Sequence, residues 1–163
     1  EASFGAVCDP EAAQILCKRR FGEKITLDLG GKNDPDLGGG PLRLTGEILG
    51  NYGGNYVSEG PMYAGLTKSF GPTAVFRVEG VDILVTTHNL QILDRMQFAS
   101  FGIHPEKLKV VALKSMQHFR AAYEPLAAKV IVCDSGALAR PRRSTLPFKN
   151  VRRPVYPLDL IAR

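Results

Sequence analysis

The sequence predicts a mixed α+β fold, and three observations carry that prediction. Residues 24–88 contain short apolar runs separated by turn residues, which is typical of an antiparallel sheet or partial barrel. Residues 109–134 follow the order strand, polar turn, short helix, strand, which is the order of a βαβ unit. Residues 139–163 contain four prolines and predict an extended arm. With 163 residues and no internal repeat, the chain is expected to form a single domain, 1–163, that includes this arm.

The N-terminal residues predict a strand followed by a helix. Residues 3–7 are short and apolar, as in a strand. Asp9 is a good N-cap, and Pro10 suits the first position of a helix. Apolar residues at helical spacing extend this element to about Arg20, and Phe21-Gly22 ends it.

The antiparallel half is predicted from alternation and from turn residues. Residues 24–29 alternate apolar and polar side chains, as in a strand with one wet face. A glycine-rich loop, 30–41, separates this strand from a second alternating run, 42–49. Glu79-Gly80 joins two apolar runs as a β-hairpin turn. A helix over 94–101, with Asp94 as N-cap and Gly102 after its end, follows the hairpin.

The turn of the expected βαβ unit is polar, although the strands expected on either side of it are apolar. It follows the strand 110–113, and a second strand is expected at 129–133. Ligands of such units collect at the carboxyl ends of the strands, near helix N-termini that favour anions. Lys114, Ser115, His118 and Arg120 all fall within this turn. The alternative is structural: Ser115 caps the helix, the two cations are solvated, and His118 packs at the helix start.

Composition limits the function classes. The net charge of +5 comes from residues 139–163, which contain seven basic residues and one acid. This arm contains no RNA-binding pattern of interleaved basic and aromatic residues, so no nucleic-acid partner is expected. No apolar run approaches the roughly 20 residues that span a bilayer, so no membrane partner is expected. Three unpaired cysteines favour a reducing, cytoplasmic location. The start at Glu1 without a signal peptide indicates a fragment or a processed chain.

Local catalytic motifs are missing from the sequence. The three histidines are 16 and 14 residues apart, without an HExxH motif or a cysteine pair, so no metal ligands are predicted. The serine motif GxSxG and the phosphate-binding motifs GxxxxGK[ST] and GxGxxG are also missing. The glycine-rich loop alone therefore predicts a mobile loop that can touch an anion.

Four motifs occur together in a recognisable order. They are Gly30-Gly31-Lys32-Asn33-Asp34-Pro35, Gly60-Pro61-Met62, the segment from Lys114 to Ala122 with Lys-Ser-x-x-His-Phe-Arg, and Arg152-Arg153-Pro154-Val155-Tyr156-Pro157-Leu158-Asp159. In these motifs the chain resembles the C-terminal domain of the microcystinase C (MlrC) family of metallopeptidase-like proteins, over nearly its whole length.

The resemblance implies a function for the polar turn. Members of this family carry a zinc site in a separate N-terminal domain, and the best-known member hydrolyses linearised microcystin and shorter peptides derived from it. This fragment would then hold no cofactor itself and would contribute substrate contacts for a peptide or small amide, being inactive alone. His118 and Lys114 are the expected catalytic residues, although whether His118 acts as acid, base or structural donor stays open. The expected substrate-binding residues are Gly31, Lys32, Asp34, Ser115 and Arg120.

Two other readings stay open. The chain can be a non-catalytic interaction or oligomerisation domain, whose arm packs against the missing N-terminal domain or against another subunit of a homo-oligomer. It can also be a basic module that binds anions, in which case binding would fall steeply with salt.

Overall fold

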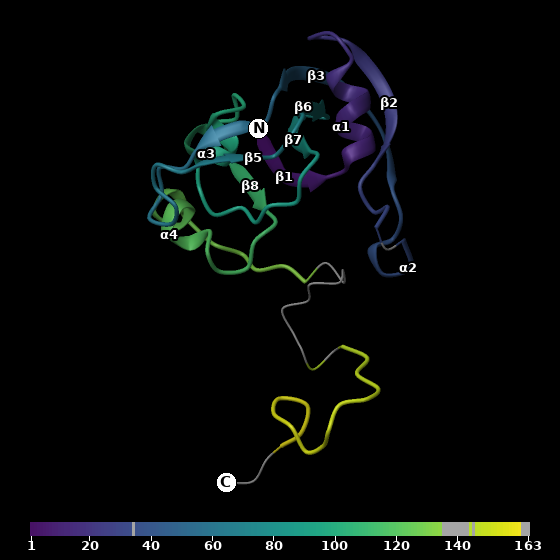
Figure 1. Ribbon diagram of the computed structural model, residues 1–163, viewed down its shortest axis with the longest axis vertical. Helices are drawn as coiled ribbons and strands as arrows, with labels where there is room; N and C mark the ends of the chain where they lie inside the picture. The colour runs from purple at the N-terminus through teal and green to yellow at the C-terminus, as the bar shows by residue number, and fades with distance from the viewer. Residues whose placement is uncertain (34, 135–143, 145, 161–163) are drawn as a thin grey trace.

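The computed structural model describes residues 1–33, 35–134, 144 and 146–160 and shows a mixed α+β domain (Figure 1). The predicted fold class is confirmed: among the described residues a six-stranded mixed sheet is accompanied by a two-stranded sheet and short helices. The elements are β1 (Ala2–Cys8), α1 (Pro10–Cys17), β2 (Lys24–Leu29), α2 (Pro35–Gly38), β3 (Leu42–Tyr52), β4 (Asn55–Val57), β5 (Thr67–Ser69), β6 (Thr73–Val78), β7 (Val81–Thr86), α3 (Met96–Ala99), β8 (Val110–Leu113) and α4 (Arg120–Tyr123).

The large sheet has the strand order β2-β3-β6-β7-β1-β8. Neighbours from β2 to β7 are antiparallel, which confirms the antiparallel half predicted for residues 24–88. Both central residues of the β6–β7 turn, Glu79 and Gly80, have positive φ angles of 48° and 84°, as a tight hairpin turn requires. β1 pairs in parallel with both β7 and β8, so three strands end at the same edge of the sheet.

Two apolar cores cover the two faces of the sheet. Helix α1 packs over β2, β3, β6 and β7, and its Ala12, Ala13 and Leu16 are fully buried. The opposite face carries an aromatic core in which the rings of Phe70 and Phe101 lie 6.0 Å apart, centroid to centroid. Because each face is buried by different residues of the same strands, the alternation of side chains fixes the register of the sheet.

The predicted helices α1 and α3 form but are shorter, and the expected N-cap is confirmed at Asp9, whereas the N-cap of α3 is Arg95 and not Asp94. Asp9 caps α1, because its side chain accepts a hydrogen bond from the backbone N–H of Ala12 at 3.0 Å. This helix ends at Cys17, before the expected Arg20. Asp94 accepts from the backbone N–H of Met96 at 2.9 Å, and α3 ends at Ala99. Caps set where a helix starts, whereas packing decides how far it continues.

The prediction of a second strand at 129–133, which would complete the βαβ unit, is wrong. β8 and α4 form, but residues 127–134 adopt no regular structure and pair with no strand, and the Ile131 side chain is 71% exposed. Helix α4 packs instead against the aromatic core through Tyr123, whose hydroxyl donates to the Asp94 carbonyl oxygen at 3.0 Å. An apolar run supplies β propensity, but a strand also needs a partner edge to which the chain returns.

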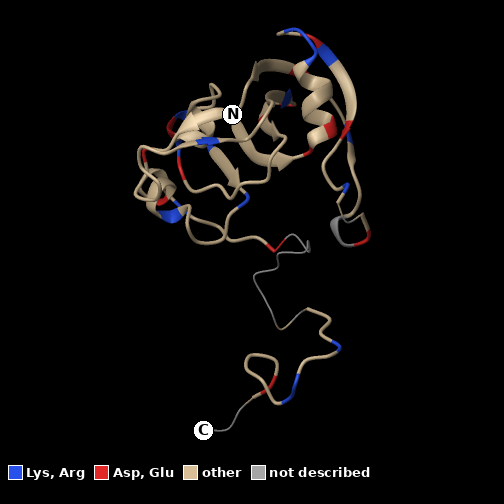
Figure 2. Ribbon diagram, in the orientation of Figure 1, with Lys and Arg blue, Asp and Glu red and all other residues tan. Residues whose placement is uncertain are grey.

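The expected C-terminal arm is described only in part, because residues 135–143, 145 and 161–163 lie outside the described residues. Residues 146–160 contain no helix or strand, and Arg153 forms an ion pair with Asp159. Figure 1 draws this segment apart from the sheet, and its charged residues, coloured in Figure 2, are Lys149, Arg152, Arg153 and Asp159. Tyr156 is exposed there.

Candidate functional site

The polar turn predicted from the sequence lies at the edge where the three parallel strands end. β1 ends at Cys8, which is paired with Thr86 at the end of β7, and β8 ends at Leu113, which is paired with Gly5 three residues earlier in β1. The segments that follow these strands therefore meet at one edge, which is where α/β sheets commonly bind ligands.

Gln91, from the segment after β7, joins two predicted site residues. Its Nε2 donates to Ser115 Oγ at 3.1 Å, and its Oε1 lies 3.2 Å from His118 Nδ1. The Gln91 backbone is itself held, because the buried Gln97 donates to its carbonyl oxygen at 3.1 Å. With Oε1 as the acceptor, His118 carries its proton on Nδ1, and Nε2 is the ring nitrogen that can meet a ligand.

Lys114 lies at the carboxyl end of β8 and is tied to β1. Its backbone N–H donates to the Gly5 carbonyl oxygen at 2.9 Å. Burial raises the pKa of the Cys8 thiol, and the nearby Lys114 charge partly opposes that rise. Among residues 1–33 and 35–133, Lys114 belongs to no ion pair. Its exposed ammonium group is therefore a cation available to an anionic ligand.

Lys32, in contrast, is committed to structure. Its Nζ lies 3.0 Å from a carboxylate oxygen of Asp9 and 2.8 Å from one of Glu11. Burial alone would raise the pKa of Asp9, but hydrogen bonds from Ala12, Gly30 and Lys32 hold it below its ordinary value. Lys32 and Asp9 thus clip the glycine-rich loop to the start of α1.

Gly31 and Asp34 are the other two site residues predicted in the glycine-rich loop. Gly31 has φ +63°, and a Cβ atom there would lie 1.9 Å from the Gly40 carbonyl oxygen. This glycine therefore serves a close backbone approach across the loop. Asp34 lies outside the described residues.

Arg120, the first residue of α4, pairs with side chains just before and just after that helix. Its guanidinium forms an ion pair with Glu124 at 2.9 Å and donates to Gln117 Oε1 at 3.2 Å. Gln91 therefore brings Ser115 and His118 together, and Lys114 precedes Ser115 in the chain. Arg120 and Lys32 already hold carboxylate partners.

The described residues do not fit a zinc site. No three histidine, cysteine, aspartate or glutamate side chains of this part of the chain come together. His88 approaches the Ser69 carbonyl oxygen at 3.4 Å, His104 lies 3.5 Å from Glu106, and His118 faces Gln91. Each histidine thus has its own, separate surroundings.

Comparison with known proteins decides the family. A family model described as "MlrC C-terminus" matches residues 1–150. The chain belongs to the MlrC C-terminal family. This confirms the resemblance drawn from the sequence motifs, although the Arg152–Asp159 motif lies beyond the matched residues.

Two relatives place this MlrC C-terminal domain in a longer context. Microcystinase C from Sphingomonas sp is 26% identical over 160 residues, which cover 96% of this chain and 29% of that protein. The crystal structure of a "Putative metallopeptidase" from Mesorhizobium sp. BNC1 superposes with a TM-score of 0.81 at 22% identity, covering 99% of this chain and 32% of that one. The chain thus spans about 30% of the length of these relatives, and the second relative shares its fold.

Sequence reasoning missed Gln91 and Cys8 as residues of this edge and named Asp9 only as a helix cap. Cys8 is the last residue of β1 and Asp9 follows it, so the rule that places ligands at carboxyl ends could have indicated both. Gln91 lies five residues beyond β7 in a segment without regular structure, and no local motif marks it.

No helix of the described residues has the length and apolar character to cross a membrane.

Proposed function

We propose that this MlrC C-terminal domain contributes substrate contacts to a metallopeptidase or related amide hydrolase whose metal centre lies elsewhere in the same polypeptide. The names of the two relatives support the reaction class. The misfit of the described residues to zinc supports a metal centre in another part of the protein. The observation that carries the proposal is the pair of Ser115 and His118 held by Gln91, with Lys114 next to Ser115 in the chain.

Lys114, Ser115 and His118 offer donors suited to a peptide substrate. The Lys114 ammonium group can pair with a substrate carboxylate or with the oxyanion that develops when an amide carbonyl is attacked. His118, positioned through Nδ1 by Gln91, presents Nε2 as a donor or acceptor. Ser115 adds a hydroxyl that Gln91 also orients. Gly31, Lys32 and Asp34 of the glycine-rich loop remain predicted as secondary substrate contacts, as does Arg120.

The experiment compares the full-length protein with residues 1–163 alone. With zinc supplied, the full-length protein is expected to hydrolyse linearised microcystin or a shorter peptide derived from it, and to lose this activity with a chelator. The chain alone is expected to show no hydrolysis under the same conditions, because its described residues bring no set of metal ligands together. Hydrolysis by the chain alone, at a rate near that of the full-length protein, would overturn the division of roles.

An assembly role is the second candidate, favoured by residues 146–160. This segment is basic, lies apart from the sheet in Figure 1, and exposes Tyr156. Such a segment is suited to packing against another domain or subunit. Under this candidate alone, substitutions at Lys114 and His118 would leave the activity of the full-length protein unchanged.

A further inference from the structure

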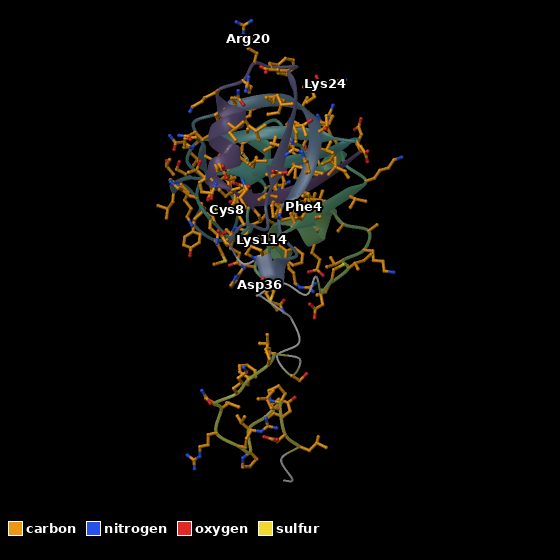
Figure 3. All side chains as sticks on the ribbon, turned by 90° about the vertical axis from the view of Figure 1, so that its right-hand side faces the viewer. Phe4, Cys8, Arg20, Lys24, Asp36 and Lys114 are labelled. Atoms are coloured by element: carbon orange, nitrogen blue, oxygen red, sulfur yellow. The ribbon has the colours of Figure 1, made fainter. Side chains whose placement is uncertain are left out.

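The face of the large sheet that carries α1 is covered over only part of its width. Helix α1 packs on β2, β3, β6 and β7. The adjoining part, formed by β1 and β8, exposes large apolar side chains: Phe4 is 44% exposed and Val110 is 58% exposed. Figure 3 looks toward this side of the molecule, with Phe4 near the middle of the globular part.

The strand register places these side chains on one face. Phe4 is paired with Ile83, which belongs to the core under α1, and with Ala112 of β8. Ala2 is paired with Val110 in the same way. Paired residues of neighbouring strands point to the same side of a sheet. Ala2, Phe4, Val110 and Ala112, here named the β1–β8 patch, therefore continue the α1 face beyond the edge of the helix.

The same strand also ends the sheet. β8 pairs with β1 on one side and, among the described residues, with no strand on the other. It carries no charged residue along its length, as Figure 2 shows. Edge strands of free-standing domains usually carry charges or Pro that prevent further pairing. An uncharged edge beside an uncovered apolar face is typical of an interface.

We infer that the β1–β8 patch docks the remaining part of the longer polypeptide in which this domain occurs. This inference rests on the proposed function, because it takes the chain as one domain of a larger hydrolase. The relatives support that occupant: they hold this fold or sequence in about 30% of their length, so a larger body of chain accompanies it. An apolar surface on that body would bury Phe4 and Val110 and place the metal-bearing part beside β8, whose far end carries Lys114.

Cysteine labelling in the full-length protein tests the inference. Val110→Cys is expected to react with N-ethylmaleimide at least ten-fold more slowly than Phe21→Cys, each rate being measured by mass spectrometry of the labelled peptide. Phe21 is the matched control, because it is 75% exposed and lies next to Arg20, far from Lys114 in Figure 3. If Val110→Cys fails to fold, Ala2→Cys reports on the same patch with a smaller change.

The outcomes separate the occupants. Slow labelling that persists on dilution supports docking within one polypeptide. Slow labelling that is lost on dilution would assign the patch to a second copy and overturn the inference, as would rates within ten-fold of each other. Labelling needs no catalysis, so a failed interface and a failed substrate role at Lys114 are distinguished.

Discussion

Replacing His118 by alanine in the full-length protein is expected to lower kcat/KM for peptide hydrolysis by about 10²- to 10³-fold, the usual loss for one catalytic donor or proton-transfer group. Its ring is exposed, and its described hydrogen bond is to Gln91, so the thermal melting temperature is expected to stay unchanged. His104→Ala is the matched control, because His104 is also exposed but pairs with Glu106 outside the carboxyl edge.

The pH–rate profile then separates the possible roles of His118. If the ring transfers a proton, the variant loses one limb of the wild-type profile. If the ring only donates a hydrogen bond, the pH–rate profile keeps its shape and kcat/KM falls by the same factor at every pH. Activity of His118→Ala within about three-fold of wild type, well below the loss expected for such a group, would remove His118 from the site.

Replacing Asp9 by alanine is expected to lower the free energy of unfolding by about 2–4 kcal/mol. Asp9 is 3% exposed and accepts hydrogen bonds from Ala12, Gly30 and Lys32, so its loss removes the cap of α1 and releases the glycine-rich loop. Glu11→Ala is the matched control, because Glu11 pairs with the same Lys32 from a 71% exposed side chain. Glu11→Ala is expected to lower the free energy of unfolding by at most about 1 kcal/mol.

The difference in the free energy of unfolding between wild type and Asp9→Ala is expected to depend on pH. The pKa of Asp9 is lower in the folded state than its ordinary value near 3.8, despite the opposing effect of burial. A carboxyl group of this kind stabilises the fold fully above its unfolded pKa, and the contribution is lost as the pH falls through the folded pKa. Urea unfolding should therefore give a constant difference between wild type and Asp9→Ala above about pH 5 and a shrinking one below about pH 4. A difference that grows with acid would contradict this assignment.

Local patterns predicted the antiparallel half because the information it needs is local. The alternation of residues 24–29 matches β2, and Glu79-Gly80 forms the expected turn, since both depend on neighbouring residues alone. The run 129–133 failed for the opposite reason. Its β propensity is high, but pairing depends on the path of the chain after α4, which the run itself does not encode.

The candidate site was predicted in part for the same reason. Lys114, Ser115 and His118 are close in sequence, so one turn brings them together. Gln91 lies 24 residues from Ser115 and 27 from His118 and reaches them only because β7, β1 and β8 end at one edge. Arg120 stays a predicted ligand contact, and its guanidinium also forms an ion pair with Glu124, four residues later.

Lysine footprinting of the full-length protein tests most directly whether the turn meets substrate. The rates of Lys114 and Lys24 acetylation would be followed by mass spectrometry, with and without a non-hydrolysable analogue of the peptide substrate. Both lysines are exposed in the domain and lie far apart in Figure 3. The proposed function predicts that the analogue slows Lys114 acetylation in a saturable way and leaves Lys24 unchanged. Equal rates at Lys114 with and without saturating analogue would contradict it.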